Sequence, residues 1–356
     1  MKGFLRSKLF LTLAALLLIA GAFAGPLSSS ILHAYAQGPI SPPAGLVSWW
    51  PGDGNYNDIV GSNNLTPQGS ITFGTGEVRQ AFLLDGITAA ADAGNAPSLQ
   101  LSSGDFTVDT WVEFNVLSHP PGFNIGAPAG DMSIVDKMFA RNGIVNSDGW
   151  RLIKQDDNHF WFCLGGINFN GCVASSAYTV RSSTSVTTGT WYHVAVVKSS
   201  NGIAIYVNGN LEDSKPLPTF TDTNSTDLLI GANTAEGSHL NGLIDEVQIF
   251  NRALSGSEIQ AIYNAGSAGQ IKAPAEINHL INLVNSFHLS SSLQTALDNK
   301  LQDVLTAINA GQTATACSEL TDFIGFVQSH TGKGITQSQA NQLIAAAQQI
   351  QAVLGC

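Results

Sequence analysis

A group of aromatic and amide side chains is concentrated within residues 161–178. It comprises Trp161, Phe169 and Tyr178 together with the amides of Asn168 and Asn170. An exposed aromatic ring can stack on the apolar face of a sugar, and a neighbouring amide can hydrogen-bond its hydroxyl groups. These five residues are therefore our candidate carbohydrate-binding residues. The alternative is a place in the core, where most aromatic residues that alternate along strands lie.

Four cysteines fall into two separated pairs. Cys163 and Cys172 enclose a short glycine-rich stretch, and Cys317 and Cys356 lie near the end of the chain. An even number of cysteines that can pair locally is typical of proteins in an oxidising compartment. The competing interpretation is a metal site, but the chain has no Cys-x-x-Cys motif and no histidine beside these cysteines at tetrahedral spacing. We predict two disulfides, one within each pair.

The first residues have the order of a secretory signal peptide. Lys2, Arg6 and Lys8 precede an apolar run over residues 9–24, and small residues suited to cleavage follow it. Cleavage after residue 24 or after residue 36 fits this pattern, and we favour removal of residues 1–36. An uncleaved membrane anchor is the alternative, but the run is shorter than the roughly 20 residues that span a bilayer. We expect the protein to be secreted or held at the cell surface.

Removal of this segment leaves an acidic chain. The sequence holds 15 Lys and Arg against 26 Asp and Glu, and three of the basic residues lie in the segment, so the net charge becomes −14. This charge disfavours nucleic acid and anionic membrane as partners, whereas divalent cations and neutral glycans remain open.

Short apolar runs separated by turn residues fill residues 46–250. The clearest strand patterns are residues 106–112, 160–163, 191–197 and 203–207. Asn208-Gly209 is a strong hairpin signal between two strands. Many short strands without helices between them indicate a sandwich of two antiparallel sheets. We place Trp49, Trp111 and Trp191 in its core.

The apolar period becomes helical after a small-residue linker at residues 265–269. The helical sets are residues 277–287, 293–308, 320–327 and 343–354. Thr336-x-x-Gln339 is a capping box for the last set, and Gly311 and Gly332 end the second and third sets. We predict four amphipathic helices, and a disulfide between the two C-terminal cysteines would stabilise so small a bundle.

Several stretches of the β-rich region have a distinctive sequence. They are GLVSWWPGDG (45–54), QAFLLDG (80–86), SGDFTVDTWV (103–112), GTWYHVAV (189–196), IYVNG (205–209) and GLIDEVQIFNRALS (242–255). With these stretches, residues 45–263 resemble the laminin-G-like branch of the concanavalin A-like jelly-roll family. The resemblance implies a mainly β fold, a jelly-roll sandwich followed here by the small all-α bundle.

The helical region carries Leu297-x3-Leu301, Cys317-x2-Leu320 and the run LIAAA at 343–347. In these features it resembles the FIMAH-type domain that ends some prokaryotic surface and secreted proteins. We divide the chain accordingly into a signal peptide (1–36), a jelly-roll domain (41–266), a linker (267–273) and a helical domain (274–356).

Members of the jelly-roll family commonly hold a structural Ca2+ at the rim, so the resemblance implies a candidate metal site. Asp53, Asp58 and the backbone carbonyls around Asn63 lie in one loop rich in Asp, Asn and Gly, which supplies the oxygen ligands that Ca2+ requires. Asp245 could meet them, because the first and last strands of such sandwiches are neighbours. The alternative is that Asp53 and Asp58 form turns and Asp245 caps a backbone turn.

The sequence does not support hydrolysis. A retaining β-glucanase of this fold would carry catalytic acids about 5 Å apart, normally as Glu-x-Asp-x-x-Glu on one strand. Asp245 and Glu246 are adjacent, so a regular strand would place them on opposite faces, and no third acid follows. We interpret His193 as a hydrogen-bonded strand residue and not as a ligand or base.

These observations together predict a non-catalytic binding protein outside the cell that recognises carbohydrate, with Ca2+ as a possible structural cofactor. The alternative is an extracellular adhesion or scaffold protein that contacts other proteins, and a polysaccharide-degrading enzyme is the least favoured of the three. The rim loops determine which ligand is bound, and the family pattern does not fix the sequences of these loops.

Overall fold

A computed structural model describes residues 40, 42–101, 104–119, 128–138, 149–165, 172–216, 225–233, 237–270, 272–354 and 356. The predicted signal peptide lies outside the described residues. Residues 38–356 form one compact unit. Among the described residues, none of the helices combines the length and the apolar character needed to span a membrane.

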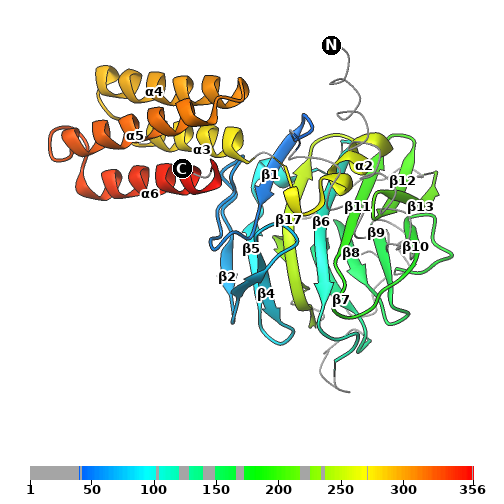
Figure 1. The fold of residues 1–356 in the computed structure, drawn as a ribbon. Helices are drawn as coiled ribbons and strands as arrows, with labels where there is room; N and C mark the ends of the chain where they lie inside the picture. The colour runs from blue at the N-terminus through cyan, green and yellow to red at the C-terminus, as the bar shows by residue number, and fades with distance from the viewer. Residues whose placement is uncertain are drawn as a thin grey trace, which may run out of the picture. The chain divides into compact units, whose positions relative to one another are not determined.

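The first sheet has eight antiparallel strands. Its order is β13-β12-β11-β6-β17-β4-β3, and β1 also pairs with β17. Figure 1 shows β6 and β17 as central neighbours. The strands are β1 (Leu46–Trp50), β3 (Thr72–Thr75), β4 (Gln80–Asp85), β6 (Phe106–Phe114), β11 (Tyr192–Ser199), β12 (Gly202–Val207), β13 (Asn210–Lys215) and β17 (Asn241–Phe250).

The second sheet has seven antiparallel strands in the order β10-β9-β8-β7-β14-β5-β2. They are β2 (Thr66–Gln68), β5 (Ala90–Gly94), β7 (Met132–Met138), β8 (Gly149–Lys154), β9 (His159–Leu164), β10 (Thr179–Ser185) and β14 (Leu228–Ile230). A short ladder of β15 (Ala232–Asn233) with β16 (Ser238–His239) and a 3-10 turn, η1 (Pro97–Leu99), complete the sandwich. The predicted two-sheet jelly-roll fold is thus confirmed.

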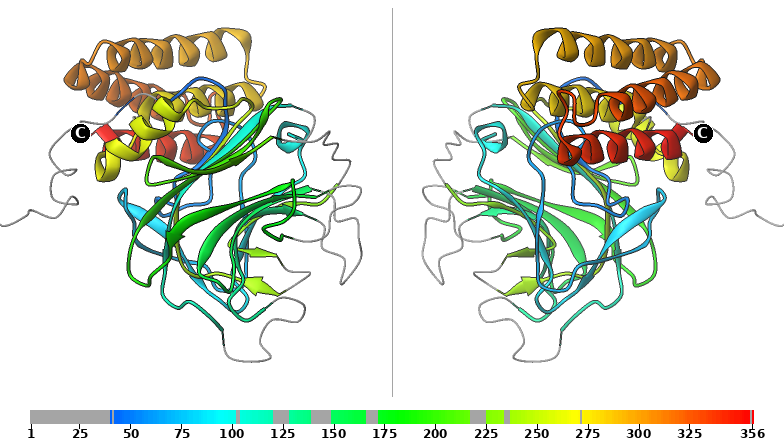
Figure 2. Two further views of the ribbon diagram at one scale, coloured as in Figure 1. Left: turned by 90° about the vertical axis from the view of Figure 1, so that its right-hand side faces the viewer. Right: turned by 90° about the vertical axis from the view of Figure 1, so that its left-hand side faces the viewer.

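The two sheets face each other (Figure 2), and the main core contains residues from both. The ring centroids of Phe106 on β6 and Trp150 on β8 lie 5.3 Å apart, and those of Phe114 and Phe160 lie 6.1 Å apart. Alternation produces this core, because every second residue of a strand points to the same face. Strand β12 follows the rule, with alternate residues buried.

Two of the three tryptophans predicted in the core are buried, and one is not. Trp49 is fully buried and Trp111 is nearly so. Trp111 lies on the outer face of the eight-stranded sheet, however, and the centroid of its ring is 5.8 Å from that of Tyr263. Trp191 is only half-buried. It lies just before β11, which begins at Tyr192, and the alternation of the strand therefore does not include it.

Helix α2 (Gly256–Ala265) covers part of that outer face. Ser255 and Glu258 form a capping box at its start. Ile259 and Ile262 of α2 pack with Phe250 of β17 in a second apolar cluster. The short turn η2 (Gly266–Ala268) follows α2.

Carboxylates of β13 cap the edge of β10, the last strand of the other sheet. Asp213 accepts a hydrogen bond from the backbone N–H of Arg181, and Glu212 accepts from the N–H groups of Ser183 and Thr184. An uncapped edge strand would offer these N–H groups to another chain. The two sheets are therefore joined at this end through side chains.

Four helices follow, as predicted: α3 (Ala273–Ser286), α4 (Ser291–Asn309), α5 (Thr313–His330) and α6 (Gln337–Leu354). Their apolar faces share one core that includes Leu280, Leu301 and Phe323. The predicted capping box is present, because the N–H of Gln339 donates to Thr336 Oγ1 and the N–H of Thr336 donates to Gln339 Oε1.

Both predicted disulfides are present. Cys163 pairs with Cys172, and Cys317 on α5 pairs with Cys356. The first joins β9 to the segment after residue 171, and the second ties the end of the chain to the third helix of the bundle.

Candidate functional site

A polar and aromatic cluster lies where the β8–β9 turn meets strand β10. In β9, Phe160 and Phe162 enter the core, so the residues between them face outward. Arg181 of β10 stands directly opposite Trp161 in the antiparallel register. Cross-strand partners share one face of a sheet, and the indole and the guanidinium are therefore neighbours.

Asp157 in the turn connects these two side chains. Its Oδ1 accepts hydrogen bonds from Trp161 Nε1 at 3.0 Å and from the backbone N–H of His159 at 3.1 Å. Its Oδ2 accepts from Arg181 Nε at 2.7 Å. Partial burial opposes ionisation of Asp157, but the bonds from Trp161 and Arg181 outweigh it and lower the pKa of this carboxyl. Asp157 is thus held as an anion.

Arg181 is fixed from three sides. Its guanidinium carbon lies 5.6 Å from the centroid of the Trp161 ring, and Nη2 lies 2.8 Å from His159 Nδ1. The side chains of Arg181 and Asp157 remain 35% and 33% exposed. We call Asp157, His159, Trp161 and Arg181 the Asp157 cluster. It offers solvent a charged donor and a charged acceptor whose orientations are set by the fold.

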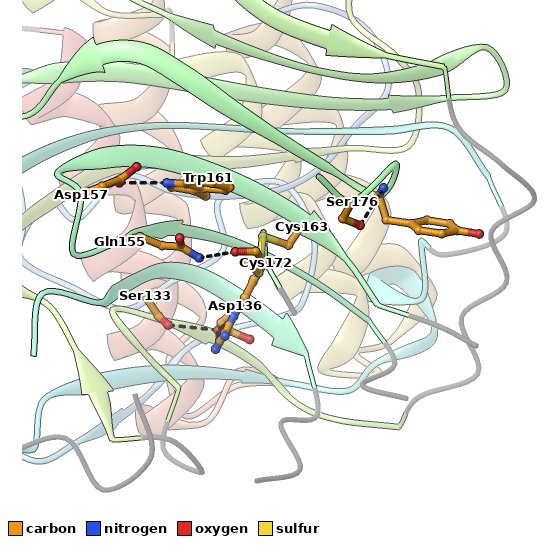
Figure 3. The surroundings of a disulfide bond; sticks show 10 residues. Ser133, Asp136, Gln155, Asp157, Trp161, Cys163, Cys172 and Ser176 are labelled. Carbon is orange, nitrogen blue, oxygen red and sulfur yellow. Dashed lines mark hydrogen bonds and ion pairs between the residues drawn. A yellow bond between two sulfur atoms is a disulfide. The ribbon is translucent and has the colours of Figure 1, made fainter. Parts of the chain in front are cut away.

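Asp157 and Trp161 of the Asp157 cluster lie near Asp136 and the first disulfide (Figure 3). The register aligns Asp136, Arg151 and Cys163 in one row across β7, β8 and β9. Asp136 Oδ2 accepts from Arg151 Nε at 2.9 Å and from Ser133 Oγ at 3.0 Å. Gln155 Nε2, in the β8–β9 turn, donates to the carbonyl of Cys172 at 3.0 Å. The disulfide and this amide therefore tie the neighbouring segment to the turn that carries Asp157.

The predicted carbohydrate-binding residues are only partly brought together. Trp161 belongs to the Asp157 cluster, but it is 6% exposed and packs with Met138 and Ile153. Tyr178 is half-buried and packs against the main core. Asn168, Phe169 and Asn170 lie outside the described residues. Trp161 thus supports its neighbours and does not itself present an open ring face.

Sequence reasoning missed Asp157, His159 and Arg181. His159 precedes Trp161 by two residues. The period of a strand therefore indicates that these two side chains share one face. Arg181 could be placed beside Trp161 only once the register of β9 and β10 was known.

The candidate calcium ligands lie in two different places. Asp58 is buried, and its carboxylate accepts four backbone N–H bonds, with Oδ1 accepting from Trp49, Val60 and Gly61 and Oδ2 accepting from Asn63. Asn63 donates through Nδ2 to Ser48 Oγ and accepts from Trp50 Nε1 through its carbonyl. These contacts engage both carboxylate oxygens of Asp58 with backbone N–H groups.

Asp53 and Asp245 belong instead to a buried cluster around Lys272. Lys272 Nζ lies 2.6 Å from Asp53 Oδ2 and also pairs closely with Glu246. Asp245 Oδ2 accepts from the N–H of Val78 at 2.8 Å. Burial raises the pKa of both Asp245 and Glu246, and their mutual repulsion raises that of Asp245 further.

The four residues therefore do not fit a single calcium site. Within the described ranges, no group of three or more His, Cys, Asp or Glu side chains has a metal-holding arrangement. An ammonium group already occupies the centre of the cluster that contains Asp53. Calcium binding by this chain stays a prediction.

The prediction that Asp245 and Glu246 face opposite sides of a strand is wrong. A bulge interrupts the pairing of β17 with β6 between Asp245 and Gln248, and Glu246 has a φ of 53°. The core-facing residues are consequently Ile244 and Val247, three positions apart. Both acids reach the Lys272 cluster because the extra residue of the bulge shifts the alternation.

His193 lies on the same outer face, away from the Asp157 cluster. It is fully buried, with Nε2 2.9 Å from Asp109 Oδ2 and its ring 5.1 Å from that of Trp111. This arrangement places His193 within the sheet and away from solvent.

Comparison with known families identifies both parts of the chain. Residues 85–260 match the model Laminin_G_3, described as the concanavalin A-like lectin/glucanases superfamily, and residues 275–352 match the FIMAH domain. The chain thus carries a concanavalin A-like domain followed by a FIMAH domain, which confirms both resemblances. No curated protein sequence matches the chain.

Solved structures with a similar arrangement include two toxin binding domains and one domain of an arabinanase. The binding domain of Paraclostridial Mosquitocidal Protein 1 is 18% identical, with a TM-score of 0.48 over 62% of this chain and 52% of that one. Domain 4 of the extracellular arabinanase AbnA from Geobacillus stearothermophilus, in complex with arabinotriose, is 18% identical, with a TM-score of 0.44 over 61% and 97%. The receptor binding domain of a botulinum neurotoxin C/D mosaic is 17% identical, with a TM-score of 0.43 over 62% and 51%. This chain spans about half the length of the two toxin domains.

Proposed function

We propose that this chain is a secreted, non-catalytic binding protein whose jelly-roll domain recognises carbohydrate at the Asp157 cluster. The observation that carries the proposal is the arrangement of Asp157, Trp161 and Arg181. In it, a carboxylate and a guanidinium are locked together over an indole and remain about one-third exposed.

Sugar recognition requires planar polar groups held in fixed directions next to a flat surface. The free N–H groups of Arg181 supply paired donors, and Asp157 supplies acceptors for hydroxyl groups. The guanidinium plane is itself a flat surface, and its contact with the indole and with His159 limits its rotation. Because these side chains are ordered before the ligand arrives, less conformational entropy is lost on binding.

The two adjacent acids of β17 also favour a binding role over hydrolysis. Asp245 and Glu246 are buried and are engaged by Val78, Trp49 and Lys272. Hydrolysis of a glycoside needs two carboxyl groups on either side of a bound sugar, and buried carboxyls that are already engaged do not supply that arrangement.

Secretion is supported by the two disulfides, because such bonds persist in oxidising compartments. The N-terminal basic residues and the apolar run that follows them agree with export. A structural Ca2+ stays a separate prediction and is not part of this proposal.

A glycan array tests the proposal. The secreted protein is applied beside Asp157→Asn, which keeps the shape of the side chain but removes its charge, and beside Asp322→Asn, an exposed position on α5. We expect a restricted set of glycans to bind the parent and the control, and the Asp157 variant to lose most of that signal. An array without any bound glycan would overturn carbohydrate recognition and favour protein-contacting adhesion. Equal binding by all three proteins would show that the glycan does not bind at the Asp157 cluster.

A further inference from the structure

A cavity of about 350 Å3 lies between the loop after β1 and helices α3 and α6. Its lining residues include the amide residues Asn57, Asn64, Gln342 and Gln349 and the apolar residues Ile59 and Leu283. Pockets for small molecules span roughly 300–1,000 Å3. This cavity therefore suits a small polar compound about the size of one sugar ring.

Two residues that line this cavity each carry a buried side-chain atom that lacks a hydrogen-bond partner among the described residues. These atoms are Glu276 Oε2 and His279 Nδ1. Glu276 is only 6% exposed, and the two residues lie one turn apart on the same face of α3. Buried polar atoms without partners are rare and costly in folded proteins, so their place in a cavity wall points to a ligand that supplies hydrogen-bond donors.

The charges around Glu276 indicate the sign of the charge that this ligand carries. Lys272 and Arg79 act on Glu276 as cations, while Asp53 and Glu246 act as anions, and burial together with these two acids raises the pKa of Glu276 to about 7. Lys272 already pairs with both Asp53 and Glu246. These two cations and two anions balance, so ionised Glu276 adds one net negative charge at this end of the cavity, which favours a cation.

We propose that this cavity binds a small hydroxylated primary amine, of which an amino sugar is the simplest type. The ammonium group would donate to Glu276 Oε2 and His279 Nδ1, and the four amides would bind the hydroxyl groups. The site is separate from the Asp157 cluster and does not depend on carbohydrate recognition there.

The test is calorimetric titration of the secreted protein with D-glucosamine and with D-glucose, which has the same ring without the ammonium group. We expect glucosamine to bind at least about tenfold more tightly than glucose. Its affinity should rise between pH 5 and pH 7, because Glu276, whose pKa is raised to about 7, becomes ionised over this range while the amine keeps its proton.

Glu276→Gln should reduce glucosamine affinity by about tenfold or more, and Asp303→Asn, an exposed position on α4, should leave it unchanged. Ala345→Phe, which fills the cavity from an exposed position, should also abolish binding without disturbing the helical core. Equal affinity for both sugars, or unchanged glucosamine binding in Glu276→Gln and Ala345→Phe, would overturn the proposal. Binding of glycans at the Asp157 cluster would be unaffected by either result.

Discussion

Lys272 Nζ lies 2.6 Å from Asp53 Oδ2, although the two residues are 219 positions apart. Asp53 follows the first strand of the jelly roll, and Lys272 immediately precedes α3. The same ammonium pairs with Glu246, whose Oε2 accepts from Trp49 Nε1 at 2.6 Å. The contact therefore ties the start of the helical domain to the first and last strands of the eight-stranded sheet.

Lys272→Met should destabilise the jelly roll strongly. The variant leaves the carboxylates of Asp53 and Glu246 buried without their cation, and breaking a buried pair in this way costs about 3–5 kcal/mol. All six tryptophans lie in the jelly-roll region, so urea unfolding followed by tryptophan fluorescence measures this domain. Lys333→Met, at an exposed position, is the control. If the midpoints of the two variants agreed, Lys272 would have no such role.

The pH dependence of stability should include a contribution from Glu276. Its pKa is raised from 4.5 to about 7 in the folded protein, so the folded state binds more protons than the unfolded state between these values. Stability should consequently fall as pH rises from about 4.5 to about 7, by at most about 3 kcal/mol from this group.

The helical circular dichroism signal during urea unfolding at pH 5 and pH 8 measures this effect. Glu276→Gln should lose less stability than the parent between the two conditions, and Asp303→Asn should behave as the parent does. An identical loss in the parent and in Glu276→Gln would show that Glu276 has no raised pKa.

Asp58→Ala should destabilise the jelly roll to the same extent with calcium and with chelator. Its carboxylate accepts four backbone N–H bonds, and leaving several buried donors unpaired costs on the order of 2–4 kcal/mol. Thermal unfolding of the parent and the variant in both conditions provides the measurement. A calcium-dependent rise in the Tm of the parent that the variant lacks would instead establish a calcium site at this loop.

Removal of the Cys317–Cys356 disulfide should destabilise the helical domain. The bond closes a loop with a sequence separation of 39, and the chain-entropy model assigns such a loop about 4 kcal/mol. The double variant Cys317→Ser, Cys356→Ser should lower the Tm of the helical signal and leave the tryptophan-detected transition of the jelly roll in place. An unchanged helical Tm would contradict the prediction.

Local features of the fold were predictable from the sequence. Asn208 and Gly209 form the two-residue loop between β12 and β13, with φ values of 49° and 75°, because these residue types tolerate the left-handed conformation that such a hairpin requires. The capping box at Thr336 and the apolar periods of the helices also depend only on residues that are close in the sequence, so they were predictable too.

Features that depend on distant parts of the chain were not predictable. The bulge at Glu246 changes the side of the strand on which an acid lies, and nothing in the local alternation indicates it. Arg181 lies beside Trp161 because of strand register, and Lys272 reaches Asp53 because of the path of the chain after α2. Asp58 was predicted as a metal ligand because its loop composition suits both a cation and a network of amide bonds.

Carbohydrate binding at the Asp157 cluster is tested most directly by Arg181→Lys. Lysine keeps the positive charge but cannot reproduce the planar paired donors of arginine. Calorimetry with the strongest glycan from the array should show an affinity at least about tenfold weaker for Arg181→Lys than for the parent, with Lys333→Met unchanged. Undiminished affinity in Arg181→Lys and Asp157→Asn would contradict the claim.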